Sequence, residues 1–404
     1  MDLEQLAALR SREGTAALAA ADELIEADRL AAVSALRAHG FGADLAGAAL
    51  TQAVLRARAV TKFGDDAARL FFTQEGLEQA TRPAVAARRA ARLAQAGVRR
   101  LTDLGCGLGA DTIAAARAGI SVHAVEADPA TAAIAAYNIE QLGLDAVVTC
   151  ADVRDIALDR VGAAYCDPAR RQQGTGVRRT RRVFRPEDYS PPWEWVARLP
   201  IEVPYTVLKL APGIDPDLLP DACELELTSV DGDVVEAAAW CGPLAQVPRR
   251  ASVLRRRAAG HPGHIVHELT GSGLATGPVG EVGDYLYDPD GAVVRSHLVA
   301  EFARTVDGRL GDPDIAYVWA SEPTVTPFGR CFEVDEVLPF SLKRLRAALR
   351  ERGVGRVEIL KRGSALDVEQ LRRELRLSGD AEASVLLTKV AGRPVAVIAR
   401  ALPR

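Results

Sequence analysis

The spacing of hydrophobic positions indicates a helical N-terminal region. Apolar residues within 1–78 recur at helical spacing, as in Leu24, Ile25, Leu30, Val33 and Leu36. Glycine, which disfavours helix interiors, interrupts this pattern at Gly14, Gly40 and Gly64. We therefore predict a helical domain over residues 1–78, with its helices broken at these three glycines.

From residue 99 the pattern changes to short apolar runs that alternate with Ala-rich helical stretches. The apolar runs span residues 101–104, 122–125, 147–150, 163–166 and 205–210. This alternation is typical of parallel strands joined by crossover helices. We therefore predict an α/β domain with a parallel sheet over residues 79–245.

The alternation ends after Trp240, in a stretch marked by proline and arginine. We expect a domain boundary between residues 245 and 275, with residues 246–330 forming a linker and a small α+β subdomain. The pattern over 331–401 predicts strand, helix, strand, helix, strand, strand, with Ser341 and Asp367 at helix N-caps. A separate α+β domain is therefore expected over residues 331–404.

Length and composition are compatible with several domains and exclude some classes of protein. The 404 residues are 48% hydrophobic, which is enough to bury more than one core. No apolar run is long enough to cross a bilayer, and the first residues lack a secretory pattern, so we expect a cytoplasmic protein without a membrane partner. The six cysteines form no C-x-x-C pair, which argues against a zinc ribbon. The net charge of −4 means that any nucleic-acid surface must be local.

The strongest chemical signal is a glycine-rich turn after the first predicted strand. Gly105, Gly107 and Gly109 follow that strand with the spacing G-x-G-x-G, at a point where backbone must turn tightly or lie against a ligand. This spacing differs from the G-x-G-x-x-G pattern of dinucleotide-binding proteins. Asp103 precedes the glycines, and its carboxylate suits a cationic amino-acid moiety better than a diphosphate.

Two further acids follow the next two predicted strands. Glu126 lies at the end of the second strand, where an acidic side chain bonds ribose hydroxyls in doubly wound folds. Asp152, with Val153 after it, follows the third strand. The ordered acids predict S-adenosyl-L-methionine as the cofactor. The alternative is that these acids merely cap helices and that the glycines merely turn the chain.

Five motifs carry a resemblance to a known family. They are D-L-G-C-G-L-G-A-D (103–111), V-E-A-D-P (125–129), Y-C-D-P-A-R-R (165–171), F-R-P-E-D-Y-S-P-P (184–192) and L-K-L-A-P-G-I-D (208–215). Together they resemble bacterial class I methyltransferases with a THUMP-like C-terminal domain, and the resemblance continues to residues 338–343. Residues 71–86 are more distantly similar to the entry of trimethylguanosine-synthase-like enzymes, which methylate an exocyclic amine of an RNA cap guanine.

The resemblance implies an S-adenosylmethionine-dependent enzyme that acts on RNA. It implies a Rossmann-like class I methyltransferase sheet at 79–245, an N-terminal helical domain and a C-terminal α+β domain of ferredoxin-like or THUMP-like type. The residues expected to bind the cofactor are Asp103, Gly105, Gly107, Gly109, Asp111, Glu126, Asp152 and Val153.

We place the catalytic residues Asp167 and Pro168 at the end of the fourth predicted strand. Amino-group methyltransferases carry D/N-P-P-aromatic there, where the acid or amide accepts hydrogen bonds from the target amine and the aromatic ring stacks on its base. Here Ala169 replaces the second proline and Arg170 replaces the aromatic, which puts the nitrogen target in doubt. The alternative is that Asp167 and Pro168 only shape a turn.

The segment after Asp167 is the best candidate for substrate contact. It carries seven arginines and no acid before Glu187, and an aromatic stretch follows, a composition expected of single-stranded nucleic-acid contact. We expect tRNA or rRNA to contact Arg170, Arg178, Arg179, Arg181, Arg182, Tyr189, Trp193 and Lys209. A solvated basic loop, or a patch that faces a protein, is the alternative, and Lys209 would then only pair with a nearby carboxylate.

Other features leave three functions open. The Arg-rich helices of residues 341–376 are assigned to RNA docking by the resemblance, but interspersed acids also fit a solvated helix face. His261, His264 and His267 lack a cysteine or carboxylate at ligand spacing, so we expect no metal site. An RNA methyltransferase accounts for the most features. A methyltransferase for a protein or small molecule, and a non-catalytic RNA-binding protein that retains the cofactor fold, are the alternatives.

Overall fold

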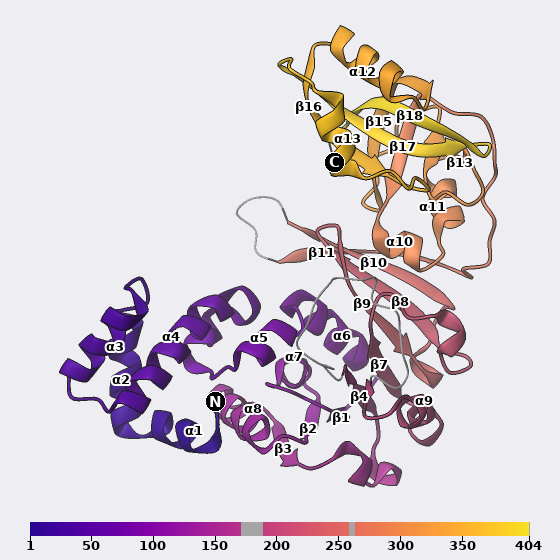
Figure 1. Ribbon diagram of the computed structural model, residues 1–404. Coiled ribbons are helices and arrows are strands. Elements are labelled where there is room, and N and C mark those ends of the chain that lie inside the picture. Colours follow the sequence, from indigo (N-terminus) through magenta and orange to yellow (C-terminus); the bar gives the residue numbers. More distant parts are fainter. Residues whose placement is uncertain (171–188, 258–262, 404) are drawn as a thin grey trace. The chain divides into compact units, whose positions relative to one another are not determined.

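The computed structural model describes residues 1–170, 189–257 and 263–403 (Figure 1). Its contacts divide the chain into two compact units. The first contains Met1–Leu210, Asp217–Cys223 and Ala239–Ala245, and the second contains Ala211–Pro216, Glu224–Ala238 and Gln246–Arg404.

The helices and strands are labelled in chain order. The α-helices are α1 (Leu3–Arg10), α2 (Arg12–Asp22), α3 (Arg29–Ala38), α4 (Ala43–Phe63), α5 (Gln74–Gln79), α6 (Pro83–Gln95), α7 (Ala110–Arg117), α8 (Pro129–Leu142), α9 (Trp193–Glu202), α10 (Gly291–Arg295), α11 (Val299–Thr305), α12 (Leu342–Glu351) and α13 (Val368–Leu375). The strands are β1 (Arg100–Leu104), β2 (Ser121–Glu126), β3 (Ala146–Cys150), β4 (Ala164–Cys166), β5 (Ala169–Arg170), β6 (Tyr189–Ser190), β7 (Thr206–Leu210), β8 (Glu224–Val230), β9 (Asp233–Trp240), β10 (Arg249–Arg256), β11 (His264–Gly271), β12 (Tyr285–Pro289), β13 (Arg309–Leu310), β14 (Val318–Ala320), β15 (Gly329–Pro339), β16 (Val354–Lys361), β17 (Ala381–Val390) and β18 (Arg393–Ala401).

The N-terminal region is helical, and one of its three expected helix breaks is wrong. Gly40 and Gly64 follow α3 and α4 with positive φ, as expected of glycines that end helices. Gly14 instead lies in the first turn of α2, whose N-cap Ser11 accepts a hydrogen bond from the Gly14 N–H. A Cβ at Gly14 would lie 2.2 Å from the carbonyl oxygen of Ala8, so glycine here allows α1 and the start of α2 to pack closely.

The predicted run of parallel strands is confirmed. Strands β3, β2, β1, β4 and β7 are neighbours in that order, and each of these pairs is parallel. The order reverses at β1, because β2 and β3 lie on one side of it and β4 and β7 on the other. Ligands of doubly wound folds bind at the carboxyl ends of the strands at such a switch point. The sheet continues beyond β7 through β9, β8, β10 and β11.

Two amide side chains hold the segment that leads into the sheet. The Asn138 amide on α8 accepts from the Phe71 N–H at 2.8 Å and donates to the carbonyls of Phe71 and Leu108 at 3.1 and 3.2 Å. Gln52 on α4 makes a similar pair of bonds with the backbone of Phe72. Because Leu108 belongs to the glycine-rich turn, Asn138 ties this turn to the entering segment.

The C-terminal region forms a second sheet. Its strand order is β13-β14-β12-β15-β18-β17-β16, and only β16 and β17 are parallel. The expected succession of strand, helix, strand, helix, strand, strand is confirmed from β15 to β18. Helices α12 and α13 bury Leu345, Leu349, Leu371 and Leu375 in one core with β16, β17 and β18.

Two kinds of feature are absent from the described part of the chain. No helix there is both long enough and apolar enough to cross a membrane. The same residues contain no cluster of three His, Cys, Asp or Glu side chains suited to a metal ion.

Asn138→Ala is expected to lower the free energy of unfolding by about 2–4 kcal/mol. The substitution leaves the buried N–H of Phe71 and the two carbonyls without their partner, and unsatisfied buried groups are costly. Urea denaturation checks this. Glu140→Ala on the same helix is the control, since its ion pair with Arg10 is exposed and long at 3.5 Å, and it should cost under about 0.5 kcal/mol. Equal losses in the two variants would contradict the role given to Asn138.

Candidate active site

The glycine-rich turn connects β1 to α7 at the carboxyl edge of the sheet. Gly105, Gly107 and Gly109 all have positive φ, between 55 and 93°, which L side chains rarely adopt. The N–H groups of Gly105 and Cys106 bond the carbonyl of Val125 in β2, which fixes the start of the turn. A Cβ built at Gly107 would meet nothing within 4 Å, so the space beside this residue is open.

Asp103 is buried in β1, between Ala124 of β2 and Tyr165 of β4. Asp103 is 1% exposed, and its Oδ2 accepts a hydrogen bond from the Thr112 hydroxyl at 2.5 Å. Burial raises the pKa of Asp103 to about 7, and the nearby Asp111 carboxylate adds to the shift. Within residues 1–170, 189–257 and 263–403, Oδ1 has no hydrogen-bond partner. An ammonium group is the kind of donor that fits this oxygen.

Glu126 ends β2 and faces the glycine-rich turn. Its Oε2 accepts from the Gly107 N–H at 3.0 Å, and its Oε1 accepts from the Asp128 N–H at 3.0 Å. Each carboxylate oxygen has a second lone pair, so two ribose hydroxyls can still donate to this side chain. Glu126 therefore both shapes the turn and lies where a nucleoside sugar is expected.

Asp152 and Val153 follow β3 at the same edge. The Asp152 carboxylate accepts from the Arg154 backbone and guanidinium, and these bonds lower the pKa of Asp152 to about 2. Val153 begins a short 3-10 helix, and its side chain is buried. The cofactor contacts predicted for these two residues stay predictions.

Asp111 lies in the first turn of α7 and is held by residues that sequence reasoning did not single out. Its carboxylate pairs with the Arg89 guanidinium and accepts from the Thr81 hydroxyl at 2.7 Å. Burial acts to raise the pKa of Asp111, but the positive charges of Arg89 and Lys209 outweigh it and lower the pKa. Arg89 also donates to the Tyr165 hydroxyl at 3.0 Å and lies over the Tyr165 ring.

A signal for Arg89 was present in the sequence. Arg89 occupies the buried stripe of α6 together with Val85, Ala86 and Leu93, so it is a charged residue at an apolar helical position. A charge in such a stripe predicts a buried partner. The partner itself was not predictable, because Asp111 belongs to a different helix.

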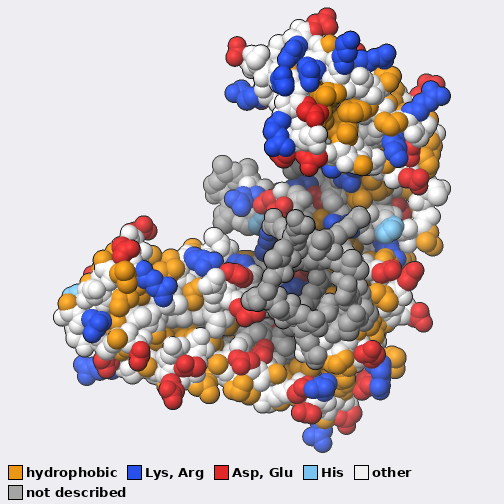
Figure 2. Space-filling view, viewed as in Figure 1, with side chains coloured by type: hydrophobic (Ala, Val, Ile, Leu, Met, Phe, Trp, Pro, Cys, Tyr) orange, Lys and Arg blue, Asp and Glu red, His pale blue; other side chains and the backbone are white. Residues whose placement is uncertain are grey.

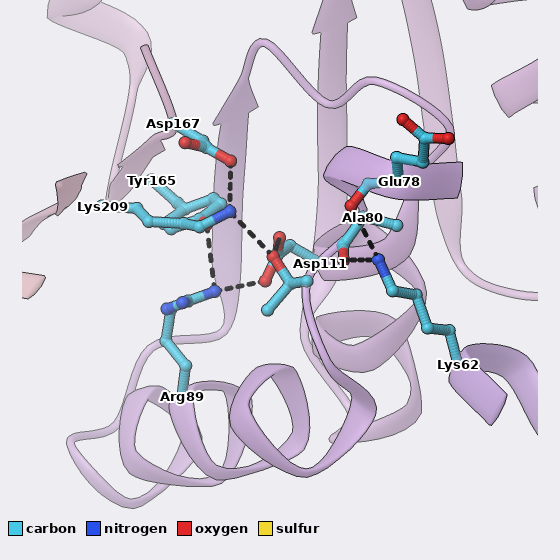
Figure 3. Close-up of polar contacts among 9 residues, drawn as sticks. Lys62, Glu78, Ala80, Arg89, Asp111, Tyr165, Asp167 and Lys209 are labelled. Atoms are coloured by element: carbon cyan, nitrogen blue, oxygen red, sulfur yellow. Dashed lines mark hydrogen bonds and ion pairs between the residues drawn. The ribbon is translucent and has the colours of Figure 1, made fainter. Parts of the chain in front are cut away.

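Asp167 follows β4 and pairs with Lys209 of β7. The Lys209 Nζ donates to Asp167 Oδ2 at 2.5 Å and to the Thr81 hydroxyl at 3.0 Å (Figure 3). A Cβ on Gly105 would lie 3.6 Å from the Asp167 carbonyl oxygen, so the Asp167 backbone adjoins the glycine-rich turn. Pro168 follows and is buried. The predicted reaction centre and the predicted cofactor turn therefore meet at the β1/β4 switch point.

The residues expected to contact substrate are only partly described. The backbone of Arg170 in β5 pairs with Tyr189 in β6, which brings Tyr189 back to the strand that follows Pro168. Tyr189 and Trp193 are both buried, with ring centroids 6.0 Å apart, so a base could stack on either ring only after it moved. The remaining expected contacts lie outside the described residues: Arg178, Arg179, Arg181 and Arg182.

Two parts of the chain match domain families. Residues 329–401 match the family described as THUMP domain-like, which supports the THUMP-like resemblance of the C-terminal domain. Residues 2–59 match a domain of unknown function (DUF8688).

Whole-chain comparisons address the fold and the cofactor. A protein of Mycobacterium tuberculosis strain H37Rv, named as an uncharacterized S-adenosylmethionine-dependent methyltransferase, is 35% identical over 351 residues, 83% of this chain and 91% of the relative. The counterpart in strain CDC 1551 / Oshkosh gives the same values. The crystal structure of a Porphyromonas gingivalis W83 protein, described as a methyltransferase, covers 100% of both chains with a TM-score of 0.73 and 22% identity. This likeness supports the fold.

These comparisons confirm the predicted fold class, the enzyme class and S-adenosylmethionine as the cofactor. The degree of identity and its extent over most of both chains establish the relationship. By descent and by fold, this chain belongs to the S-adenosylmethionine-dependent methyltransferases.

Proposed function

We propose that this methyltransferase modifies RNA, such as tRNA or rRNA, at an exocyclic amine of a base. The observation that carries the proposal is the position of Asp167, whose backbone adjoins Gly105 in the glycine-rich turn. A carboxylate at this point can accept a hydrogen bond from an amine and hold its nitrogen in line for transfer. The arginine-rich segment continues directly from Asp167, and its composition suits a phosphate backbone.

The described residues fit the cofactor. Asp103 would receive the ammonium of its amino-acid moiety on Oδ1, Glu126 would receive the ribose hydroxyls, and Gly105 to Gly109 would lie against it. Asp152 and Val153 would complete the cofactor site at the end of β3. The cofactor supplies a methyl group on a sulfonium, which is already a good leaving group. The protein therefore contributes mainly alignment of the acceptor and exclusion of water.

The C-terminal domain offers exposed basic residues for docking RNA. Several arginines of this domain are used internally: Arg346 donates to the Glu374 carbonyl, Arg350 to the Arg376 carbonyl and Arg372 to the Val357 carbonyl. Lys343, Arg344 and Arg373 are exposed on α12 and α13. Figure 2 shows Lys and Arg side chains gathered on the surface of this domain. The exposed residues are therefore the better candidates for phosphate contact.

A protein or small-molecule acceptor is the second candidate. Two observations favour it, namely the replacement of the usual proline and aromatic by Ala169 and Arg170, and the burial of Tyr189 and Trp193. Stacking on a base needs an exposed ring, and neither of these rings is exposed.

Transfer of a tritiated methyl group separates the two candidates. Purified protein and labelled cofactor are incubated with total RNA, with total protein and with a small-molecule extract, each from cells that lack this enzyme. We expect label in RNA that is sensitive to ribonuclease and is recovered as an N-methylated nucleoside by mass spectrometry. Label that appears in protein or small molecules and not in RNA would overturn the RNA assignment.

Cofactor affinity is expected to fall as the pH drops below about 7. The raised pKa of Asp103 means that a proton occupies its carboxyl at low pH, and this proton competes with the cationic cofactor. The loss approaches about tenfold per pH unit. Calorimetry from pH 5.5 to 7.5 measures the trend. Asp103→Asn is the control, because its side chain does not ionise, so this variant should bind the cofactor weakly and with an affinity that changes little across this pH range. If the cofactor affinity of the wild type changed with pH in the same way as that of Asp103→Asn, the role given to Asp103 would be contradicted.

Substitutions of the acceptor carboxylate and of the arginines should fail in different ways. Asp167→Ala is expected to lower kcat about 100-fold while RNA and cofactor affinities change less than about twofold, since its interaction matters chiefly during transfer. Replacing Arg178, Arg179, Arg181 and Arg182 by Ala should instead weaken RNA binding. The log-log salt slope should flatten by about 0.7–0.9 for each phosphate that the variant no longer neutralises. An unaltered slope in the quadruple variant would place the phosphate-binding residues elsewhere.

A further inference from the structure

Lys209 points an ammonium at the carboxylate on which the proposed acceptor chemistry depends. Its side chain is 15% exposed, and that of Asp167 is 37% exposed. A largely buried ammonium is costly unless it is paired, so Lys209 holds Asp167 more firmly than a surface lysine would. The described residues make their hydrogen bonds to Asp167 through Oδ2, which leaves Oδ1 without a partner in this part of the chain. One oxygen is thus fixed by Lys209, and the other can receive an acceptor amine.

The same ammonium is joined to the cofactor side of the site through one hydroxyl. Thr81 Oγ1 accepts from Lys209 at 3.0 Å and donates to Asp111 Oδ2 at 2.7 Å. The direction is unambiguous, because an ammonium only donates and an ionised carboxylate only accepts. Asp111 in turn pairs with Arg89. Figure 3 shows the side chains of Arg89 (α6), Asp111 (α7), Tyr165 (β4) and Lys209 (β7) converging.

The position of Thr81 is itself held by a second lysine. Lys62 Nζ donates to the carbonyls of Leu77, Glu78 and Ala80 at 2.7, 2.9 and 2.7 Å, at the end of α5. These bonds fix the backbone directly before Thr81, and Figure 3 shows Lys62 beside Glu78 and Ala80. The backbone that carries this hydroxyl is therefore anchored, and the Thr81 side chain itself is buried and bonded to both Asp111 and Lys209.

Each of the two cations, Lys209 and Arg89, is paired with one carboxylate. Lys209 and Arg89 supply two positive charges, and Asp111 and Asp167 supply two negative charges. The charges of Asp111 and Asp167 both act on Asp103, so loss of Lys209 would leave Asp167 without its ion pair beside these acids.

We propose that Lys209 is a positioning residue for methyl transfer. Lys209 fixes the Asp167 carboxylate through Oδ2, and its bond to Thr81, which in turn bonds Asp111, sets the position of that carboxylate relative to the cofactor turn. The proposal rests on the proposed role of Asp167 as the group that receives the acceptor. It differs from a substrate-binding role for Lys209, because the ammonium is used within the protein and does not contact a phosphate.

Lys209→Met, Lys209→Arg and Thr81→Val test the proposal in the full-length protein. The acceptor is whichever fraction the wild type labels, whether RNA, protein or small molecule. Lys209→Met should lower kcat about 10- to 100-fold, while KM for the acceptor and the dissociation constant of the cofactor change less than about twofold. Lys209→Arg should recover part of the loss, because it retains the charge and donors, and Thr81→Val should show a smaller loss. Arg29→Met, at an exposed position at the start of α3 in the N-terminal helical region, is the control and should behave as wild type.

A double variant gives a readout that loss of folding cannot imitate. If Lys209 acts through Asp167, then Asp167→Ala combined with Lys209→Met should be no slower than Asp167→Ala alone. The proposal would be overturned if the loss of kcat in the double variant equalled the product of the two single losses. An unchanged kcat in Lys209→Met would also overturn it. If Lys209 instead contacts a phosphate of an RNA acceptor, Lys209→Met should lose that contact, and the log-log salt slope of RNA binding should flatten by nearly one. A wild type that labels only protein or small molecules refutes the RNA assignment, whereas these variant outcomes refute the role of Lys209.

Discussion

Two buried carboxylates, Asp103 and Asp111, lie with the partly exposed Asp167 where the strand order reverses at the carboxyl edge of the sheet, and burying a carboxylate costs free energy unless it is compensated. Arg89 and Lys209 compensate Asp111 and Asp167, and Thr112 bonds one oxygen of Asp103. Asp103 thereby keeps a raised pKa and an oxygen suited to a cationic ligand. The requirement to pair buried charge accounts for why α6, α7, β4 and β7 all contribute a polar side chain at this point.

The segment before β1 does more than connect the helical region to the sheet. Asn138 and Gln52 bind the backbone of Phe71 and Phe72, and Lys62 binds the carbonyls at the end of α5. Thr81, which follows, then supplies the hydroxyl shared by Lys209 and Asp111. The N-terminal helices therefore stabilise the site at a distance, because they fix the backbone that carries this hydroxyl.

Within the site, each group has a distinct chemical task. Glu126 bonds the glycine-rich turn, and in our proposal this turn, Glu126 and the carboxylate of Asp103 bind the cofactor. Asp167, which Lys209 holds, is the group that we propose to receive the acceptor, where a small displacement of a carboxylate is costly for an in-line transfer. The C-terminal domain, which carries the THUMP domain-like match, is built around its own core, and its exposed basic residues are separate from the arginines that close its helices.

The sequence by itself determined the parallel strands, the glycine-rich turn, the acids at the strand ends and the C-terminal order of elements. Each of these depends on local periodicity or on a residue beside its own strand. It also predicted a helix break at Gly14, which was wrong because close contact with Ala8, and not a turn, requires that glycine. Only the tertiary structure decided that Arg89, Thr81 and Lys209 serve Asp111 and Asp167. These residues are far apart along the chain, and charge pairing between separate elements leaves no periodic trace in the sequence.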